Sequence, residues 1–385
     1  MGPERGRKTH RAIQNERSKE LLHEKKELSW YCIFGQIEVQ ERIWGSAQSR
    51  YKRIFAPAIG VSALSKSRRL QRVLADFGAE QPFGAGSKRF KEHYGFEMSA
   101  SSVRVETLRH AKQAARMLEG EYGRSFRTLP KEGADYVIAE ADGTMICTVE
   151  AGSRKGVRPR NWQEMRLVAA MARGSPTPLY GATFGDVMEA GRRWGHCTRQ
   201  AGWGLSSKIH ALADGAEWIE KQGREVFGDQ MRFTVDFYHL SDYLAAASET
   251  CRPKAPKRWL KTQQTRLKKG AACKVLEALK ANEESASAPD EAAPVRTAAR
   301  YLSRRMEQVD YPHALANELP IGSGLIESGN RHVLQARLKG PGTAWLKQNA
   351  HDLAQLRVLR ANDRWDQYWL AQRVPNWPLD GTHHF

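Results

Sequence analysis

Three acidic residues, Asp142, Asp214 and Glu327, have the side chains and the positions needed to hold a divalent metal ion. Asp142 and Asp214 each follow a short apolar run typical of a strand, and Glu327 opens a helix-like segment after a Gly-rich bend. In open α/β sheets, ligand sites gather at strand ends where neighbouring connections diverge. Carboxylates that meet there repel one another unless a cation lies between them, and Mg²⁺ or Mn²⁺ prefers such oxygen ligands. The pattern predicts a site for one or, more typically, two such ions, which suits phosphodiester displacement.

Each of these acids also has a purely structural interpretation. Asp142 precedes Gly143, and an Asp-Gly pair commonly forms the turn of a β-hairpin. Asp214 could cap the helix that begins near residue 216, and Glu327 could simply favour the positive end of its own helix. Their joint placement in one order of strands and helices favours the metal site.

A second acidic element, the run Asp-Phe-Tyr-His at 236–239, follows the fifth predicted strand. Asp236 is the main rival of Asp214 as the second metal ligand. Asp236 and His239 could instead support the site from behind or contact the scissile phosphate, with His239 the stronger candidate. The alternative is an ordinary cap between a strand and a helix, and the sequence leaves this choice open.

The elements that would position these residues follow the order of a ribonuclease-H-like fold, an α/β sheet with helices on its faces. Within residues 131–372 we predict a hairpin, then strand, helix, strand, helix, strand, helix. The hairpin would turn at Asp142-Gly143. The charged segment 249–318, which contains an Ala/Ser/Pro-rich linker at 282–294, is predicted to be an all-α insertion. The predicted elements are a hairpin of 136–139 and 145–149, strands at 179–182, 208–213 and 231–235, and helices at 184–194, 216–227, 240–248 and 345–369.

The preceding region, residues 1–130, is basic and predicted to be mainly helical and to bind DNA. Residues 1–27 are very polar and indicate an arm or a frayed helix, whereas 30–39 and 42–44 have strand-like patterns. Two short helices, a turn with glycine and a third basic helix within 67–115 fit a helix-turn-helix. A plain helical hairpin fits that segment equally well. Residues 373–385 are predicted to be an irregular tail.

The overall composition narrows the partners of the chain. Its 385 residues are 41% hydrophobic and 27% charged, with a formal net charge of +18. Such an excess of positive charge favours nucleic acid or an anionic membrane surface. No run approaches the roughly 20 apolar residues that span a bilayer, and the first residues do not have the pattern of a secretory signal. Nucleic acid is therefore the better partner, and a cytoplasmic protein associated with the nucleoid is expected.

The five cysteines are scattered, odd in number and without a Cys-x-x-Cys pair. Neither a zinc ribbon nor a disulfide framework is indicated. We expect buried, reduced thiols.

Four motifs carry a resemblance to a known family. They are Ala-Asp-Gly-Thr at 141–144, Ala-Asp-Gly-Ala-Glu-Trp-Ile at 213–219, Val-Asp-Phe-Tyr-His at 235–239 and Pro-Ile-Gly-Ser-Gly-Leu-Ile-Glu-Ser at 320–328. With the run from Arg337 to Trp345, they resemble the DDE-type insertion-sequence transposases of the Kra type, and more distantly the Lre-type and MULE-like transposases. The resemblance covers about residues 135–370. It implies that Asp142, Asp214 and Glu327 form the catalytic triad. The chain departs from the family in one respect, because it does not have the paired cysteines that some relatives carry near the N-terminus.

Under this resemblance the chain would be a transposase that cleaves the ends of its element and joins the freed 3′-OH strand to target DNA. Its partners would be the terminal repeats and the target DNA, bound by a dimer or a larger assembly. Arg331, Arg337 and Lys339 would contact DNA phosphates, which supply affinity without sequence choice; a solvated helix face is the alternative. Two other functions stay open: a ribonuclease-H-like nuclease without strand transfer, and a non-catalytic, domesticated DNA-binding protein.

Overall fold

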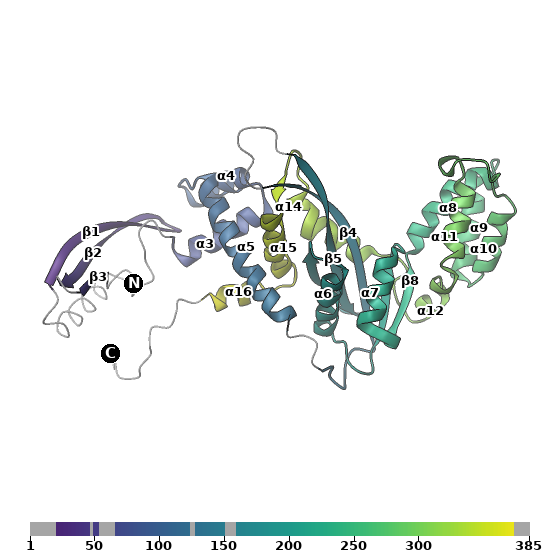
Figure 1. Cartoon of the computed structure of the whole chain (residues 1–385), viewed down its shortest axis with the longest axis horizontal. Helices are drawn as coiled ribbons and strands as arrows, with labels where there is room; N and C mark the ends of the chain where they lie inside the picture. The colour runs from purple at the N-terminus through teal and green to yellow at the C-terminus, as the bar shows by residue number, and fades with distance from the viewer. Residues whose placement is uncertain (1–20, 47–48, 54–65, 124–127, 151–158, 373–385) are drawn as a thin grey trace. The chain divides into compact units, whose positions relative to one another are not determined.

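The computed structural model of the chain describes residues 21–46, 49–53, 66–123, 128–150 and 159–372 (Figure 1). It divides into an N-terminal unit, Met1–His110 with Trp365–Phe385, and a central unit, Ala111–Arg364. The boundary between the two units follows His110, whereas the predicted domain boundary followed residue 130. The residues from Trp365 onward group with the N-terminal unit. None of the described helices is long and apolar enough to cross a membrane. The predicted tail 373–385 and residues 1–20 lie outside the described residues.

The N-terminal unit begins with a three-stranded antiparallel sheet in the order β1-β2-β3, which includes the strand-like patterns predicted at 30–39 and 42–44. The strands are β1 (Leu21–Cys32), β2 (Gly35–Ser46) and β3 (Ser49–Arg53). Residues 21–27 belong to β1, so they are not part of a frayed helix. The reason is cross-strand pairing: β1 pairs with β2 from Leu21↔Gly45 to Cys32↔Gly35, a partner that local polarity does not reveal.

The predicted helices of this unit are present as α3 (Arg68–Glu80), α4 (Phe83–Tyr94) and α5 (Ala100–Tyr122). Ser67 accepts a hydrogen bond from the Leu70 N–H and caps α3, and Ser99 accepts one from the Ser102 N–H at the start of α5. Their apolar faces meet in one buried cluster. The helix-turn-helix stays a prediction. The cluster is built from Leu70, Leu74, Phe90, Met98 and Val103.

The central unit contains a mixed sheet in the order β6-β5-β4-β7-β8, with a short β9 beside β4. β4–β5 and β5–β6 are antiparallel, and β4–β7 and β7–β8 are parallel. Three strands match the predicted ones closely, and β5 is a strand that the sequence pattern did not reveal. The bounds are β4 (Tyr136–Val149), β5 (Arg160–Ala172), β6 (Leu179–Thr183), β7 (Lys208–Ala213), β8 (Met231–Val235) and β9 (Trp345–Leu346).

The predicted hairpin at Asp142-Gly143 is wrong, because both residues lie inside one continuous 14-residue strand, β4. Gly143 pairs with Arg166 on β5, and a Cβ at Gly143 would lie 2.1 Å from the Glu164 carboxylate. Gly143 thus lets the Glu164 side chain approach the strand closely, a role that the dipeptide alone cannot distinguish from a turn.

The two faces of the sheet carry different side chains because residues alternate along each strand. Val137, Ala139 and Ala141 of β4 belong to the large apolar core together with Trp194 of α6 (Val187–Gln200). α7 (Glu217–Phe227) packs beside α6 on this face, with Ile219 in the same core. The alternate residues of β4, including Glu140 and Asp142, face the segment that carries Glu327.

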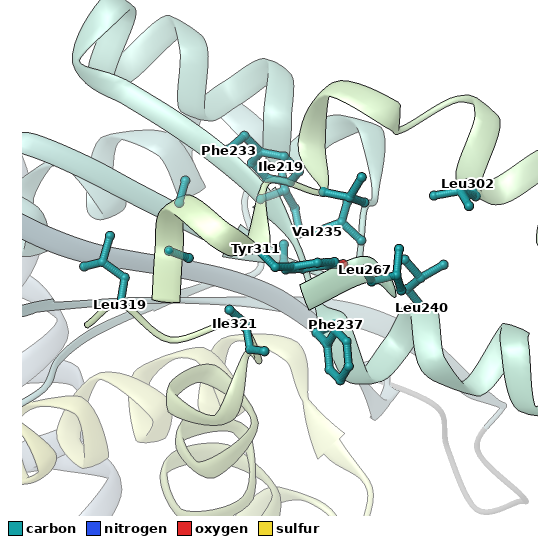
Figure 2. Close-up of a cluster of buried hydrophobic side chains, with 14 of the residues drawn as sticks. Ile219, Phe233, Val235, Phe237, Leu240, Leu267, Leu302, Tyr311, Leu319 and Ile321 are labelled. Carbon is teal, nitrogen blue, oxygen red and sulfur yellow. The ribbon is translucent and has the colours of Figure 1, made fainter. Parts of the chain in front are cut away.

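Helices fill most of the chain between β8 and residue 316, and Figure 1 shows α8 to α11 gathered beyond the β8 end of the sheet. We call this group, together with α12, the helical insertion. An apolar cluster joins it to the sheet, with Val235, Phe237, Leu240, Leu267 and Ile321 among the side chains shown in Figure 2. Its helices are α8 (Phe237–Cys251), α9 (Pro256–Lys268), α10 (Ala272–Lys280), α11 (Pro294–Ser303) and α12 (Tyr311–Ala316).

The single closing helix predicted for 345–369 is three elements: β9, α15 (Lys347–Ala361) and α16 (Trp365–Ala371). Asp363 has a φ of 55°, in the left-handed region, and interrupts the helical path between α15 and α16. All five cysteines are free, and Cys32, Cys147 and Cys197 are buried. Cys251 is half-buried and Cys273 is exposed, so the expectation of buried thiols is wrong for these two.

Candidate active site

Asp142 and Asp214 lie at neighbouring positions of two parallel strands. The pairing of β4 with β7 runs to Glu140↔Leu212, so each aspartate lies two residues beyond the same rung. Adjacent strands are about 4.8 Å apart, which keeps two such side chains within electrostatic reach. Burial raises the pKa of Asp142, and the negative charges of Asp214 and Glu164 raise that pKa further, whereas the Gly143 N–H lowers it. The structure therefore brings the first two predicted acids together.

The turn after β7 presents Asp214 to solvent. Gly215 has a φ of 92°, which favours glycine, and the Asp214 carboxylate accepts the Ala216 N–H at 2.9 Å. The insertion holds the same turn from outside: the Tyr301 hydroxyl donates to the Asp214 carbonyl at 2.6 Å, and Arg305 donates to the Gly215 carbonyl at 2.6 Å. The N-cap of α7 is Ala216, without a side-chain cap, so the bond that Asp214 accepts belongs to the turn before the helix and its side chain stays exposed.

The Gly-rich bend before Glu327 is fixed to the sheet by three contacts. His210 on β7 forms a hydrogen bond between its Nε2 and the Pro320 carbonyl at 2.8 Å. The Phe237 N–H donates to the Ile321 carbonyl at 2.8 Å. The Ser323 N–H donates to the Asp236 carboxylate at 2.6 Å, and the Ser323 hydroxyl donates to the same oxygen. These contacts set where the next helix starts.

The helix carrying Glu327, α13 (Gly324–Gly329), is held over β4 by two side chains of that strand. Glu140 accepts the Ile326 N–H at 2.8 Å, and Asp142 accepts the Asn330 side-chain amide at 2.6 Å. Glu140 and Asp142 are two residues apart on one strand, so they share a face. Glu327 itself is exposed, and its Oε1 lies 3.4 Å from the Ser323 hydroxyl. All three predicted acids therefore lie around one end of the sheet.

Glu140 is a residue of this cluster that the sequence analysis missed. It is 1% exposed, and burial together with the charges of Asp236 and Glu327 raises its pKa to about 8, against hydrogen bonds from the Ile326 and Leu325 amides. The only available signal was alternation, since the Glu-Ala-Asp run at 140–142 puts both acids on one face of any strand. The predicted hairpin hid that signal.

Asp236 is a structural residue in this arrangement. It is 2% exposed, and one carboxylate oxygen caps α8 by accepting the Tyr238 and His239 N–H groups at 2.5 and 2.9 Å. Its other oxygen accepts both donors of Ser323. A carboxylate with both oxygens occupied by protein donors is poorly placed to bind an ion, and Asp236 instead joins the start of α8 to the bend before Glu327. The His239 ring packs edge-on against Tyr243 and Tyr301.

The basic residues after Glu327 separate into exposed and buried ones. Residues Asn330–Gln335 form a π-helical segment, a rare form that is frequent at functional sites. Arg331 and Lys339 are exposed, as a phosphate contact requires. Arg337 is 5% exposed, and its guanidinium lies 4.9 Å from the centre of the Trp345 ring, so its predicted contact with DNA phosphate does not fit its position.

The residues of the cluster suit a hard divalent cation, although the described residues contain no preformed group of three His, Cys, Asp or Glu ligands. Two buried oxygens beside Asp142 have no hydrogen-bond partner in the part of the chain that the structure describes: Glu140 Oε1 and Asn330 Oδ1. Buried polar atoms are normally satisfied. The acidic side chains of the cluster would bind such an ion through oxygen atoms. Asp214 and Glu327 are exposed, so their side chains can change rotamer to reach it.

Comparison with known proteins places part of the chain in a family of unknown function. Residues 205–368 match an uncharacterised protein family, UPF0236. The matched region contains Asp214, the helical insertion, the bend and Glu327, and it begins after Asp142. No curated protein matches the chain.

Proposed function

We propose that this protein is a DDE-type DNA transposase that cleaves the ends of an insertion sequence and joins the 3′-OH strand to target DNA. The observation that carries the proposal is the convergence of Asp142, Asp214 and the Glu327 helix at one end of the sheet. The strand order β6-β5-β4-β7-β8, with β5 antiparallel to β4 and a helical insertion before Glu327, supports a ribonuclease-H-like fold for it.

Under this proposal Asp142, Asp214 and Glu327 would hold Mg²⁺ or Mn²⁺, two ions in the usual arrangement. When bound, such ions activate the attacking water or 3′-hydroxyl and stabilise the leaving oxygen. The protein positions the acids: Asn330 orients Asp142, Tyr301 holds the Asp214 turn, and Asp236 fixes the bend before Glu327. Arg331 and Lys339 are exposed on the segment after Glu327 and would contact phosphates there.

The test is cleavage and joining on DNA that carries the flanking ends of the protein's own locus. We expect Asp142→Asn, Asp214→Asn and Glu327→Gln each to abolish Mg²⁺-dependent strand cleavage while DNA binding persists. Glu217→Gln is a matched control, because Glu217 is an exposed acid three residues from Asp214 that contacts none of the cluster. Full cleavage by one of the three variants would remove that residue from the triad.

The same assay separates the alternative functions. Cleavage without joining of pre-cut 3′-OH ends would indicate a nuclease that lacks strand transfer. DNA binding with neither reaction, and no carboxylate-dependent Mn²⁺ binding by calorimetry, would indicate a non-catalytic DNA-binding protein. Light scattering on the DNA complex tests the proposed dimer or larger assembly.

A further inference from the structure

The helical insertion carries an unusually one-sided charge. Between residues 252 and 276 there are nine Lys or Arg and no Asp or Glu. Five of these cations line a surface groove of about 480 Å³ formed by α9 and the start of α10. The acid cluster is not part of this groove. We call it the α9 groove, and its cations are Arg258, Lys261, Arg266, Lys269 and Lys274.

The arrangement follows from helical periodicity. Trp259, Gln263 and Leu267 are buried and face the core of the insertion. Arg258, Lys261 and the other groove residues of α9 recur at spacings of three and four, so they form the opposite, solvent-facing side. The chain then turns at Gly270, whose φ is 75°, and α10 brings Lys274 to the same groove.

Carboxylates from the described part of the chain do not neutralise these cations. Within the described ranges, none of the five groove cations forms an ion pair with an acidic side chain, whereas Arg296 and Arg300 of the same insertion both pair with Asp290. Concentrated like charges destabilise a folded protein through repulsion, and a bound anion relieves that cost. The groove is therefore built for an anionic partner.

The shape and chemistry of the groove fit a nucleic-acid backbone. Arg258 and Lys269 are eleven residues apart on the chain, which spans about 16 Å at 1.5 Å per helical residue. That length corresponds to about five steps of one DNA strand at 3.4 Å each. No aromatic side chain lines the groove, so it has no platform on which unpaired bases could stack, as single-strand binders use. Phosphate contacts to a duplex are the fitting interaction.

The C-terminal end of α9, next to the groove residue Lys269, lies close to the start of α8. Lys268, at the end of α9, places its ammonium 4.7 Å from the centre of the Phe237 ring, and Phe237 directly follows Asp236. The other end of the groove, at Arg258, lies at the start of α9. The end of the groove at Lys269 is therefore the end nearer to the strand end that carries Asp236.

We propose that the α9 groove binds the phosphate backbone of duplex DNA, without sequence preference, and carries DNA on one side of the acid cluster. The choice of DNA as the polyanion rests on the proposed function, whereas the anion-binding groove does not. This role is separate from that of Arg331 and Lys339.

The test compares two double variants of the full chain with equal loss of charge. Lys261→Gln with Lys269→Gln removes two groove cations, and Lys280→Gln with Arg304→Gln removes two exposed cations of the insertion that do not line it. Affinity for duplex DNA of arbitrary sequence is measured in EDTA at several salt concentrations. We expect the groove variant to bind duplex DNA about tenfold or more weakly than the native protein. The negative slope of log K against log salt should become less steep by about 2, because each lost phosphate contact reduces its magnitude by about 1. The control variant should keep both values near those of the native protein.

The exposed thiol of Cys273, next to Lys274, gives an independent readout. Duplex DNA should slow its modification by a maleimide in the native protein and the control variant, but not in the groove variant. Equal losses of affinity in both variants, or no loss in the groove variant, would overturn the proposal. Tighter binding of duplex RNA of the same length would overturn DNA as the partner. Because EDTA stops metal-dependent cleavage, a failed groove and a failed transposase activity give different results.

Discussion

Asp236 and Asp214 are both aspartates at the ends of parallel strands, and the structure gives them opposite roles that a stability measurement separates. Asp236 is 2% exposed and accepts four hydrogen bonds, two from the start of α8 and two from Ser323. Asp214 is exposed, and its side chain accepts one bond from the Ala216 N–H. We expect Asp236→Asn to destabilise the protein and Asp214→Asn to leave its stability nearly unchanged.

The expected loss of stability follows from the hydrogen bonds that the asparagine side chain of each variant can keep. An asparagine at position 236 can still cap α8 with its oxygen, but its NH₂ would then face the Ser323 N–H, which is also a donor. A bond to a charged acceptor is worth about 1.5–3 kcal/mol, and the Ser323 hydroxyl can rotate to accept from the new NH₂, so the loss of the Ser323 N–H bond should cost up to about 3 kcal/mol. An asparagine at position 214 keeps the oxygen that accepts the Ala216 N–H, and an exposed change of this kind stays within about 0.5 kcal/mol.

The assay is thermal and urea unfolding of both variants without metal. For a unit of this size, 3 kcal/mol corresponds to a melting temperature lower by about 6–12 °C. Asp236→Asn should also weaken cleavage, because the bend before Glu327 loses its anchor, whereas Mn²⁺ binding should fall more in Asp214→Asn. Equal melting temperatures, or a larger loss in Asp214→Asn, would refute the assignment of Asp236 as the structural member of the pair.

Three further predictions concern the surroundings of the acids. Burial raises the pKa of Glu140 from 4.5 to about 8, so the native state retains a proton that the unfolded state loses as pH rises, and stability falls over this interval. Glu140→Gln should therefore be no more stable than the native protein at pH 4.5. At pH 7 in EDTA its free energy of unfolding should exceed that of the native protein by up to about 3 kcal/mol, since the interval is about 2.5 pH units at about 1.36 kcal/mol each. A gain in stability that does not change with pH would contradict this. Tyr301→Phe removes the 2.6 Å hydrogen bond to the Asp214 carbonyl and should cost about 1 kcal/mol in urea unfolding, with a cleavage defect that Tyr243→Phe, a neighbouring ring without a bond to this turn, does not share. Gly143→Ala would put a Cβ 2.1 Å from the Glu164 carboxylate and should destabilise by about 1–3 kcal/mol, and a neutral effect on the melting temperature would show that Glu164 moves aside freely.

Some elements were readable from sequence because local patterns specify them. The strands β7 and β8 have the bounds predicted, 208–213 and 231–235, since each is a short apolar run enclosed by helices and turns. Ser67 and Ser99 mark the starts of α3 and α5 through capping that needs no distant partner. The order of strands and helices from 179 to 248 followed from the same signals.

Other elements depended on partners far away in the chain. β5 carries polar residues at its start and was not predicted, and β1 is a strand because β2 pairs with it. The residues Asp142-Gly143 have the local signature of a turn, yet continuous pairing with β5, from Val137↔Ala172 to Val149↔Arg160, keeps β4 extended through them. A dipeptide pattern cannot report which backbone hydrogen bonds the rest of the fold supplies.

The sequence by itself determined which acids could act, because the residue types and their places after strands limit the candidates to a few. Only the tertiary structure decided which acids are buried and hydrogen-bonded within the fold and which are exposed. Burial and hydrogen bonds made Asp236 an anchor, added Glu140 beneath α13 and placed Arg337 under Trp345. These outcomes depend on contacts between residues up to 186 positions apart, such as Glu140 with Ile326, which no local pattern contains.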